Sequence, residues 1–552
     1  MSDIPSDEFM TTLSAAEQAG NWEEVERLFD TLTVAQRNEP ALLARHAVSV
    51  MNAGDTARAA TMTRKAHRLA PENTYIQVQL GKLYLEQKRY DIAEKTLRGV
   101  VEHEAENREA LTYLSRVLLD RGENTPEAEE FARRAAEASP GEVLPLLQWA
   151  ALIANDPSRL DEAEVIFERA LEISPNLPSA LHNYGLIKRF KGELDTAEDY
   201  LKRAIAVRPN EAGYIFSLGI CHYFQERMEE ALACFRRSAE INPGDNPAKV
   251  YAAYALFHLG RDKEAWTEYE NRLVLKDLQE ANYNRPRWDG GPLNGETVLL
   301  IPEQGIGDNL QFIRYTEMVA ERGGTVIVAT HKPMERLFKS LKGAEWVTNT
   351  TPEPKHFHRY CPVMSLPYTF GADGDNVPQN VPYLRAPDDL IDHWAERLGS
   401  YSGKKVGLCW RGNPKHVNDR FRSSSLEQMT QLLDVPGVTF FSLHKDRPEF
   451  EQDLPDGMVD IGSDFEDFAD TAAAMEALDL VISVDTSVCH MAGAIGRPTW
   501  TMIARGPDFR WKLTGETTPW YPSMTLYRQE NLGDWSGVFE RMKRDLTEMA
   551  SA

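Results

Sequence analysis

The fold of the first half of the chain is decided by a pattern best seen in residues 179–210, SALHNYGLIKRFKGELDTAEDYLKRAIAVRPN. A small residue, Gly185, is followed by Ala197, by the large apolar Leu201 four positions later, and by the closing Pro209. The closing residues recur at steps of 34 or 35 positions. They are Pro71, Ala105, Pro140, Pro175, Pro209 and Pro243.

Two further columns keep register with these closing residues. The first column is small (Gly81, Ser115, Ala150, Gly185, Gly219, Ala253), and the second is alanine (Ala93, Ala128, Ala163, Ala197, Ala231, Ala265). Two antiparallel helices pack closely where a small residue lets their backbones approach. One such hairpin cannot bury its apolar face alone, so neighbouring hairpins must stack.

A helical hairpin repeated every 34 residues is typical of the tetratricopeptide repeat. The sequence therefore predicts an all-α solenoid over residues 1–275, helical from roughly residue 8, with a weaker capping unit near Asn21. The concave groove of such an array usually binds a protein or peptide, and the alternative is a plain spacer. Self-association through the array is also open.

Composition restricts the partners and the compartment. The 552 residues are 42% apolar and carry a formal charge of −24, which argues against nucleic acid and anionic membranes as main partners. The same charge can equally serve solubility alone. Apolar runs fall short of the ~20 residues that span a bilayer, and the acidic start lacks a signal-peptide layout. We expect a cytoplasmic protein without membrane insertion.

The cysteines and one acidic pair do not indicate a metal site. The five cysteines are spread along the chain without C-x2-C spacing, so we expect reduced, mostly buried thiols and no metal. Cys221, His222 and Cys234 fall at core-like helical spacing. The stretch Asp373-Gly374-Asp375 follows no strand and is expected to be a surface turn.

The second half of the chain has a different period. Residues 283–292 are rich in turn formers, and short β-prone runs alternate with helical segments beyond them. This alternation predicts parallel sheets in two Rossmann-like halves, residues 297–390 and 391–552, joined to the solenoid by a linker at 276–296. The best strand candidates are Val298–Ile301, Thr325–Ala329, Lys405–Trp410, Val438–Leu443, Leu480–Val484 and Thr499–Ile503.

A glycine-rich turn follows the first candidate strand, where ligands bind in open α/β sheets. It contains Gly305, Gly307 and Asp308, but Leu310 replaces the third glycine of the dinucleotide fingerprint. The next strand ends without an acid to hold a ribose, so an NAD site is not expected. Asp308 is either a helix N-cap or a general base facing the cleft.

A second motif follows the strand Leu480–Val484. Asp485, Thr486, Ser487 and His490 lead into a helix that contains Gly493. Hydroxyls and free backbone N–H groups at a helix N-terminus form an anion site, and together these residues favour phosphate binding. Taken singly, Asp485 is a ribose ligand or a helix cap, and His490 a phosphate contact or an ordinary first-turn histidine.

A basic cluster follows the strand Lys405–Trp410. Arg411, Asn413 and Arg422 lie in a loop with four cations in a dozen residues, which would neutralise a nucleotide phosphate or be solvated. Lys445, after the strand Val438–Leu443, would assist at the nucleotide or be a plain exposed lysine.

These motifs, taken together with the repeats, resemble bacterial proteins that join tetratricopeptide repeats to a GT-B glycosyltransferase. The resemblance is closest to flagellin glycosyltransferases, with heptosyltransferase-like motifs at Gly305–Asp308 and Asp485–Gly493 and an architecture like that of O-GlcNAc transferase. It implies that Asp308 is the base and that the Asp485 motif holds the donor nucleotide. The Pro302-Glu303-Gln304 approach to the first loop departs from the heptosyltransferase pattern.

The function that this resemblance implies is metal-independent transfer of a sugar to serine or threonine of flagellin or another protein held by the repeat groove. The sugar would be a nonulosonic acid such as pseudaminic acid, carried by a nucleotide such as CMP. Two alternatives stay open: an O-GlcNAc-type transferase that uses a UDP sugar, and a non-catalytic scaffold or chaperone with a degenerate transferase half. No resident cofactor is expected.

Overall fold

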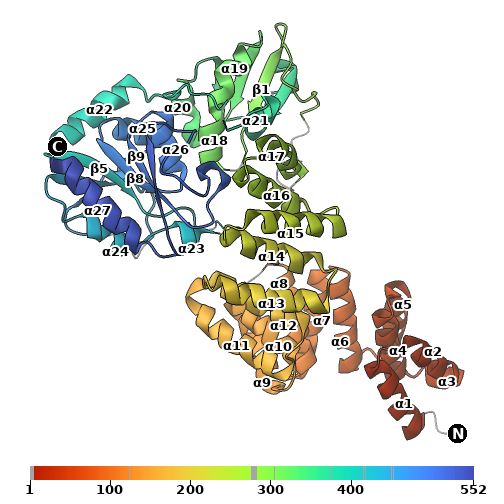
Figure 1. Ribbon diagram of the computed structural model, residues 1–552. Coiled ribbons are helices and arrows are strands. Elements are labelled where there is room, and N and C mark those ends of the chain that lie inside the picture. Colours follow the sequence, from red (N-terminus) through yellow and green to blue (C-terminus); the bar gives the residue numbers. More distant parts are fainter. Residues whose placement is uncertain are drawn as a thin grey trace. The chain divides into compact units, whose positions relative to one another are not determined.

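The computed structural model divides the chain into two compact units, Met1–Lys191 and Gly192–Ala552 (Figure 1). The structure describes residues 5–122, 125–274, 283–303, 305–374, 376–414, 416, 418–448, 451 and 453–551. No helix among these residues has both the length and the hydropathy that a membrane span requires.

The first unit is entirely helical. After α1 and α2, helices follow one another as antiparallel pairs, apart from the short α3 and the 3-10 turn at Pro157–Arg159. The helices are α1 (Asp7–Gln18), α2 (Trp22–Asp30), α3 (Val34–Arg37), α4 (Pro40–Asn52), α5 (Thr56–Leu69), α6 (Thr74–Glu86), α7 (Tyr90–His103), α8 (Arg108–Asp120), α9 (Pro126–Ala138), α10 (Val143–Ile153), α11 (Leu160–Ile173) and α12 (Pro178–Phe190).

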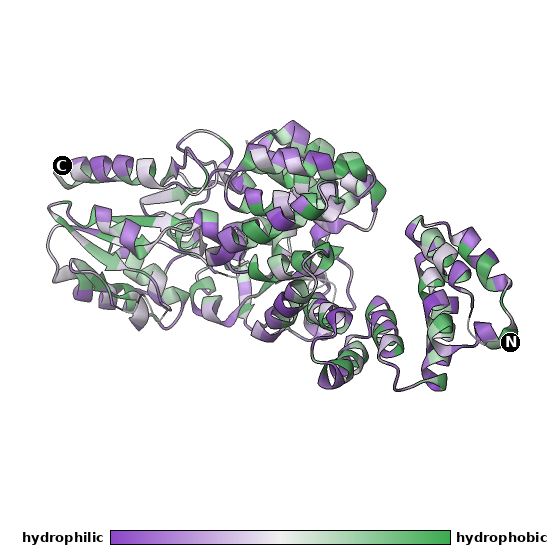
Figure 2. Cartoon of the chain, turned by 90° about the horizontal axis from the view of Figure 1, so that it is seen from below, coloured by the Kyte–Doolittle hydropathy of each residue, from purple (hydrophilic) through white to green (hydrophobic). Residues whose placement is uncertain are grey.

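The repeating columns explain how these helices pack. The alanine column lies on the second helix of each pair and is fully buried. A Cβ added at Gly81 would lie 2.6 Å from the Leu97 side chain, so glycine makes room for the large residue of the partner helix. Figure 2 shows hydrophilic and hydrophobic residues alternating around the repeat helices, as stacked amphipathic pairs require.

The repeats continue into the second unit. Its first helices are α13 (Leu194–Val207), α14 (Ala212–Phe224), α15 (Met228–Ile241), α16 (Asn246–His258) and α17 (Asp262–Tyr269), followed by the 3-10 helix η2 (Glu270–Val274). A Cβ at Gly219 would lie 2.7 Å from the Phe235 ring, as at Gly81. The predicted helical solenoid is confirmed in the first half of the chain.

The rest of the second unit contains two parallel sheets, which confirms the predicted α/β character. The four-stranded sheet has the order β3-β2-β1-β4, and the six-stranded sheet has the order β10-β9-β8-β5-β6-β7. The strands are β1 (Thr297–Ile301), β2 (Thr325–Ala329), β3 (Ala344–Thr348), β4 (Arg359–Pro362), β5 (Lys404–Cys409), β6 (Val438–Ser442), β7 (Met458–Asp460), β8 (Leu480–Val484), β9 (Thr499–Ile503) and β10 (Met524–Arg528).

All six strand candidates are present, each within one residue of its predicted ends at both termini. Sequence reasoning missed β3, β4, β7 and β10. Each missed strand forms an edge of its sheet.

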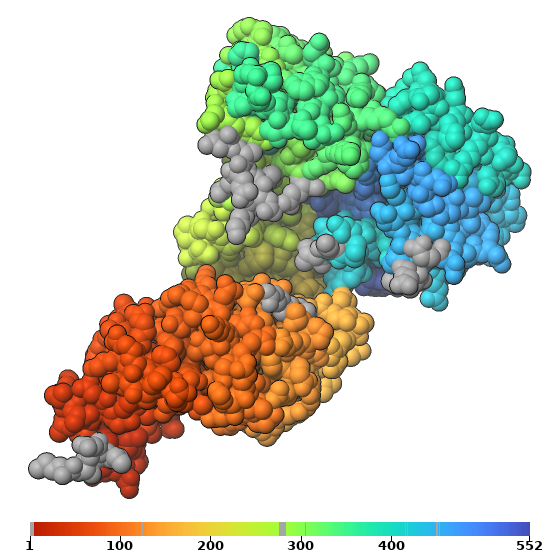
Figure 3. All heavy atoms as spheres, turned by 180° about the vertical axis from the view of Figure 1, so that it is seen from behind, coloured from red at the N-terminus to blue at the C-terminus, as the bar shows by residue number. Residues whose placement is uncertain are grey.

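Short helices connect the strands, and longer ones cover the larger sheet. They are α18 (Ile306–Phe312), α19 (Thr316–Ala320), α20 (Glu335–Phe338), α21 (Leu366–Thr369), α22 (Asp388–Gly399), α23 (Asp419–Arg422), α24 (Leu426–Met429), α25 (Phe468–Glu476), α26 (Ser487–Ala494) and α27 (Ser536–Ser551). In the space-filling view the part built on the smaller sheet is green and the part built on the larger sheet is cyan to blue (Figure 3).

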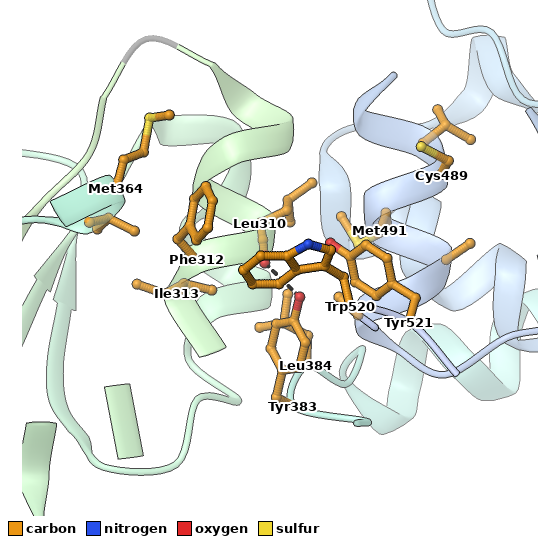
Figure 4. Close-up of a cluster of buried hydrophobic side chains, with 14 of the residues drawn as sticks. Leu310, Phe312, Ile313, Met364, Tyr383, Leu384, Cys489, Met491, Trp520 and Tyr521 are labelled. Carbon is orange, nitrogen blue, oxygen red and sulfur yellow. Dashed lines mark hydrogen bonds between the residues drawn. The ribbon is translucent and has the colours of Figure 1, made fainter. Parts of the chain in front are cut away.

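A buried apolar core joins the two sheets. Leu310 and Phe312 of α18 face Met491 of α26 across Trp520 and Tyr521 (Figure 4). Neither α18 nor α26 carries an exposed large apolar residue, because their apolar faces pack against one another and against neighbouring segments.

The predicted linker at 276–296 is only partly described, because residues 275–282 lie outside the described residues. From residue 283 the segment lies against the smaller sheet. Arg287 pairs with Tyr360 of β4, and the Trp288 backbone N–H donates to the Tyr360 carbonyl at 2.8 Å. Trp288 itself is 2% exposed, so this part of the junction is structured.

The contacts of α16 and α17 predict which N-terminal deletions leave a folded protein. Removal of residues 1–191 should leave a folded second unit, because Gly192–Ala552 is compact by itself. Removal of residues 1–275 strips the cover from Phe509 and Phe312, which pack against Phe257 and Trp266. We expect that longer deletion to aggregate or to lose its cooperative thermal transition, measured by size-exclusion chromatography and circular dichroism.

Candidate functional site

Both predicted motifs lie where the strand order of a sheet reverses. In the smaller sheet the chain runs from β1 outward to β3 and returns on the other side of β1 as β4. In the larger sheet it runs from β5 outward to β7 and returns beside β5 as β8. Ligands of open α/β sheets bind at such reversals, beyond the carboxyl ends of the strands. The Gly305 turn follows β1, and the Asp485 motif follows β8.

The two reversal points meet through α18 and α26 (Figure 1). A Cβ added at Gly307 would lie 2.7 Å from His490 Cδ2, so glycine permits the close approach of the two helices. Gly305 is the N-cap of α18, and a Cβ there would collide with the Asp308 carboxylate. Both glycines thus shape the contact between the helices.

Asn309 closes the glycine-rich turn, a role that the sequence did not reveal. Its amide nitrogen donates to the carbonyls of Glu303 and Gly305 at 2.6 and 2.7 Å. Its side-chain oxygen accepts from the Glu303 backbone N–H at 3.1 Å. These bonds within one turn fix the backbone that carries Asp308.

Asp308 does not cap its helix, because Gly305 holds the N-cap position and makes no side-chain cap. Its carboxylate forms an ion pair with Arg510 instead. Arg510 also pairs with Asp508 at 2.7 Å and donates to the Gln311 side-chain oxygen. One guanidinium therefore joins two carboxylates at the contact between the sheets.

The environment of Asp308 suits a proton acceptor. About a quarter of its side chain is accessible (26%), although protein surrounds the carboxylate on most sides. Burial raises its pKa to about 6, the nearby Arg510 charge opposes that rise, and Asp508 adds to it. At neutral pH an accessible carboxylate with this pKa is mostly ionised, and it is still basic enough to take a proton.

The α26 N-terminus is capped by Thr486, whose hydroxyl accepts from the Val488 N–H at 3.3 Å. Asp485 precedes the cap and is not the cap itself. Burial and then the Asp508 charge raise the pKa of Asp485. Ser487 is the first helical residue and is half-buried, and the first turn of α26 lies at the reversal point because it follows β8 directly.

His490 lies inside the protein. It is 4% exposed, its Nδ1 lies 3.0 Å from the Tyr521 hydroxyl, and its ring stacks on Trp511 at 5.4 Å. Burial first, and then the charges of nearby arginines, lower its pKa well below the usual range. A neutral, buried imidazole favours the packing interpretation over a direct phosphate contact.

Gly493 also has a packing role. A Cβ at this position would collide with the Tyr521 ring, which lies against α26. Glycine therefore allows Tyr521 to reach the His490 nitrogen, and nothing in this geometry places Gly493 beside a donor.

Arg422 is the residue of the basic cluster that reaches the Asp485 motif. Its Nη1 donates to the Asp485 carbonyl at 3.1 Å, and its Nε pairs with Asp419 at 3.2 Å. The other two candidates of the cluster have different side-chain surroundings. Arg411 pairs with the buried Glu451 at 2.6 Å, and Asn413 is exposed in the loop.

Lys445 points away from this site. Its side chain is exposed and donates to the Glu466 carbonyl. The structure thus brings together Asp308, Arg422 and the Asp485–Ser487 stretch, and it leaves Lys445 outside.

Sequence reasoning missed the segment after β9, which carries Asp508, Arg510 and Trp511. Its 3-10 helix η10 (Phe509–Trp511) is capped by Asp508. A signal was present, because this segment follows the strand Thr499–Ile503, and loops at the carboxyl ends of neighbouring parallel strands share one edge of a sheet. The charged residues of that loop carry no motif spacing of their own.

Asp485, Cys489 and His490 place their ligand atoms within 4.8 Å of one another, the one such group among the described residues. A cysteine binds a metal ion as the thiolate, but burial raises the pKa of Cys489 well above its usual range. Its Sγ donates to the Thr486 carbonyl at 3.0 Å, and His490 Nδ1 is engaged by Tyr521. The group is therefore better suited to packing than to holding a cation.

Comparisons with known proteins identify the repeats. The family model described as tetratricopeptide repeat matches residues 78–143 and 185–246. The chain contains tetratricopeptide repeats. A solved structure described as the APC/C hetero-tetramer Cut9-Hcn1 has a TM-score of 0.43 at 14% identity, covering 50% of this chain and 56% of that one.

Two curated proteins are similar in sequence. Protein FlbA of Caulobacter vibrioides is 28% identical over 334 residues, which cover 54% of this chain and 55% of FlbA. Protein O-mannosyl-transferase Tmtc2 of Drosophila melanogaster is 37% identical over 67 residues, 12% of this chain and 7% of Tmtc2. The chain thus spans about half the length of FlbA and less than a tenth of Tmtc2.

The raised pKa of Asp308 predicts how stability depends on pH. The unfolded chain releases this proton near pH 3.8, whereas the folded protein keeps it until about pH 6. The contribution of Asp308 to stability must therefore fall as the pH rises through this interval, by about 3 kcal/mol. Asp308→Asn should remove that part of the fall when urea unfolding of the second unit is measured between pH 4 and pH 7.

The matched control is Asp392→Asn, which replaces an exposed aspartate on α22. If Asp308→Asn and Asp392→Asn have the same pH dependence as the unaltered protein, Asp308 does not keep its proton to higher pH in the fold.

Proposed function

We propose that this protein is a glycosyltransferase with two Rossmann-like domains of the GT-B type, which transfers a sugar from a nucleotide donor to a hydroxyl of a protein. The observation that supports it is the meeting of the two reversal points, with a carboxylate on one side and a helix N-terminus on the other. A base and a phosphate site facing each other are what transfer from a nucleotide sugar to a hydroxyl requires.

Asp308 is the proposed base. Its carboxylate accepts the proton of a serine or threonine hydroxyl as the oxygen attacks the anomeric carbon. The bond between that carbon and the donor phosphate breaks, and its electron pair leaves with the nucleotide. The pKa of about 6 leaves Asp308 mostly ionised at neutral pH, ready for this role.

The departing phosphate needs positive charge at the reversal point of the larger sheet. The first turn of α26 follows β8 directly and is the proposed phosphate site, and Arg422, which donates to the Asp485 carbonyl, lies beside it. Fixed donors and a cation that are already in place stabilise the developing negative charge. In this proposal Asp485 contacts the ribose.

The repeats are the proposed acceptor-binding arm. The acceptor proposed from the resemblance is flagellin, with a nonulosonic acid as the sugar and CMP as the nucleotide. Tmtc2, by its name a protein O-mannosyl-transferase, shares similarity with a 67-residue segment of this chain, which is too short to carry the activity. A UDP-sugar transferase is the second candidate, and thermal-shift measurements with CMP and UDP separate the two donors.

Asp308→Asn tests the enzymatic proposal. The amide cannot accept the proton, so transfer to the acceptor should fall by 100-fold or more, in line with the roughly 10²–10⁴-fold contribution of a general base. Nucleotide binding should persist, because the carboxylate lies on the other side of the contact. Unchanged transfer with bound nucleotide would show that Asp308 is not the base, and absence of any transfer in the unaltered protein would favour the scaffold.

Arg422→Ala tests the phosphate site. Loss of one charged hydrogen bond should weaken nucleotide binding by about 1.5–3 kcal/mol, measured by calorimetry. The control is Arg420→Ala, on the same helix, where the guanidinium lies over the Phe421 ring. Equal losses in both variants would indicate a general effect of charge and would contradict a specific contact at Arg422.

A further inference from the structure

We infer that Arg510 is a positioning residue that holds the Asp308 carboxylate in place, and that the last repeats in turn hold Arg510. This inference rests on the proposed function of Asp308 and assigns a task to two parts of the chain that lack one. Arg510 touches neither donor nor acceptor in this scheme. It acts on the reaction through Asp308.

The contacts of Arg510 are those of a fixed cation. It is 7% exposed, pairs with Asp308 and Asp508, and donates to Gln311. Its guanidinium also lies 4.7 Å from the Phe509 ring centre and 5.5 Å from that of Phe312. A planar donor with partners on several sides has little rotamer freedom, so it defines where the Asp308 oxygens lie.

Asp308 needs a cation at this position because its other charged neighbours are acids. The titratable groups that interact electrostatically with Asp308 belong to the Gly305 turn, the end of β8, the segment after β9, and the repeat helices. They are Glu303, Asp485, Asp508, Arg510, Tyr254 and Tyr269. Without Arg510, three nearby carboxylates would favour the protonated form of Asp308.

The repeats hold the segment that carries Arg510. The Tyr223 hydroxyl donates to the Pro507 carbonyl at 2.7 Å, and His258 Nε2 lies 3.1 Å from the same oxygen. Phe509 stacks on Phe257 with 4.3 Å between ring centres. Gly506 has a positive φ of 64°, and a Cβ there would lie 2.7 Å from the Phe224 ring.

The last repeat also holds the Asp308 side of the contact. Arg272 of η2 donates from Nε and Nη2 to both carboxylate oxygens of Glu303, at 2.9 and 2.8 Å, and to the Ser365 hydroxyl at 2.7 Å. Arg272 and Glu303 are both buried. The end of the solenoid is therefore bonded to the loop before Asp308 and to the loop that carries Arg510.

The pH dependence of transfer distinguishes positioning from a general structural role. The acidic limb of the kcat profile reports ionisation of the base. Arg510→Gln should move this limb to higher pH by about 1–3 units, because it removes the cation. Asp508→Asn should move it to lower pH, since it removes an acid and keeps a side chain able to cap η10. Arg510→Lys should lie between Arg510→Gln and the unaltered protein.

If the acidic limb keeps its pH position in every variant, and kcat falls by the same factor at every pH, the positioning role of Arg510 is wrong. If both Arg510→Gln and Asp508→Asn move it in the same direction, the charge of Arg510 is not what sets the ionisation of Asp308, and the inference fails as well.

Thermal unfolding of the full-length protein gives a readout without transfer. Asp308→Asn should restore, at pH 8, part of the Tm that Arg510→Gln loses, because an amide needs no cation. The rescue should disappear at pH 5, where Asp308 is protonated. Additive losses at both pH values would overturn the inference, and adding Asp392→Asn to Arg510→Gln controls for the loss of an aspartate.

The two readouts separate failure of the inference from failure of the proposed function. Rescue at pH 8 without transfer from any nucleotide sugar would support the pairing and refute the proposed function. Transfer with neither readout altered would refute the inference alone.

Tyr223→Phe tests the contribution of the repeats. Loss of the hydroxyl should raise hydrogen exchange in residues 505–512 and lower kcat several-fold with little change in KM for the nucleotide sugar. The control is Tyr200→Phe on α13, whose ring lies 4.7 Å from the Arg203 guanidinium. Unchanged exchange in Tyr223→Phe, or an equal change in both variants, would refute the role of the repeats in holding this segment.

Discussion

The second unit depends on a buried guanidinium shared by two carboxylates. Arg510 joins Asp308, in the first turn of α18 after the smaller sheet's first strand, to Asp508, beyond a strand of the larger sheet. Removing one partner of such a group leaves a charge that is costly to bury, so the whole set must form together. These ion pairs between the two sheets can therefore form only when the loops after β1 and β9 are both in place.

This constraint gives the repeats a second task. Stacked hairpins of this period are usually a surface for binding another protein, and residues 1–191 are a compact unit of that kind. The following helices, α14, α16 and α17, instead pack aromatic residues against the loop after β9. The same repeat pattern thus forms a separate compact unit in one part of the chain and a wall of the proposed catalytic centre in another.

The strands that the sequence predicted and those that it missed differ in their place in the sheet. The six predicted strands are all interior, where burial on both faces demands continuous apolar runs such as Leu480–Val484. The four missed strands are the edges, where the pattern weakens. Ala344–Thr348 contains the exposed Glu345 and Trp346, and Arg359–Pro362 ends in a proline that an interior strand would not tolerate.

The sequence by itself determined the repeats, the parallel sheets and the positions of Asp308 and Asp485, because periodic burial and glycine-rich turns are local properties that leave a regular pattern. Only the tertiary structure decided that Gly307 lies against His490, that Lys445 points away, and that Arg510 reaches Asp308. Residues 308 and 510 are brought together by the packing of two sheets and a repeat helix bundle. A charge pair so far apart along the chain has no period or spacing from which it could be read.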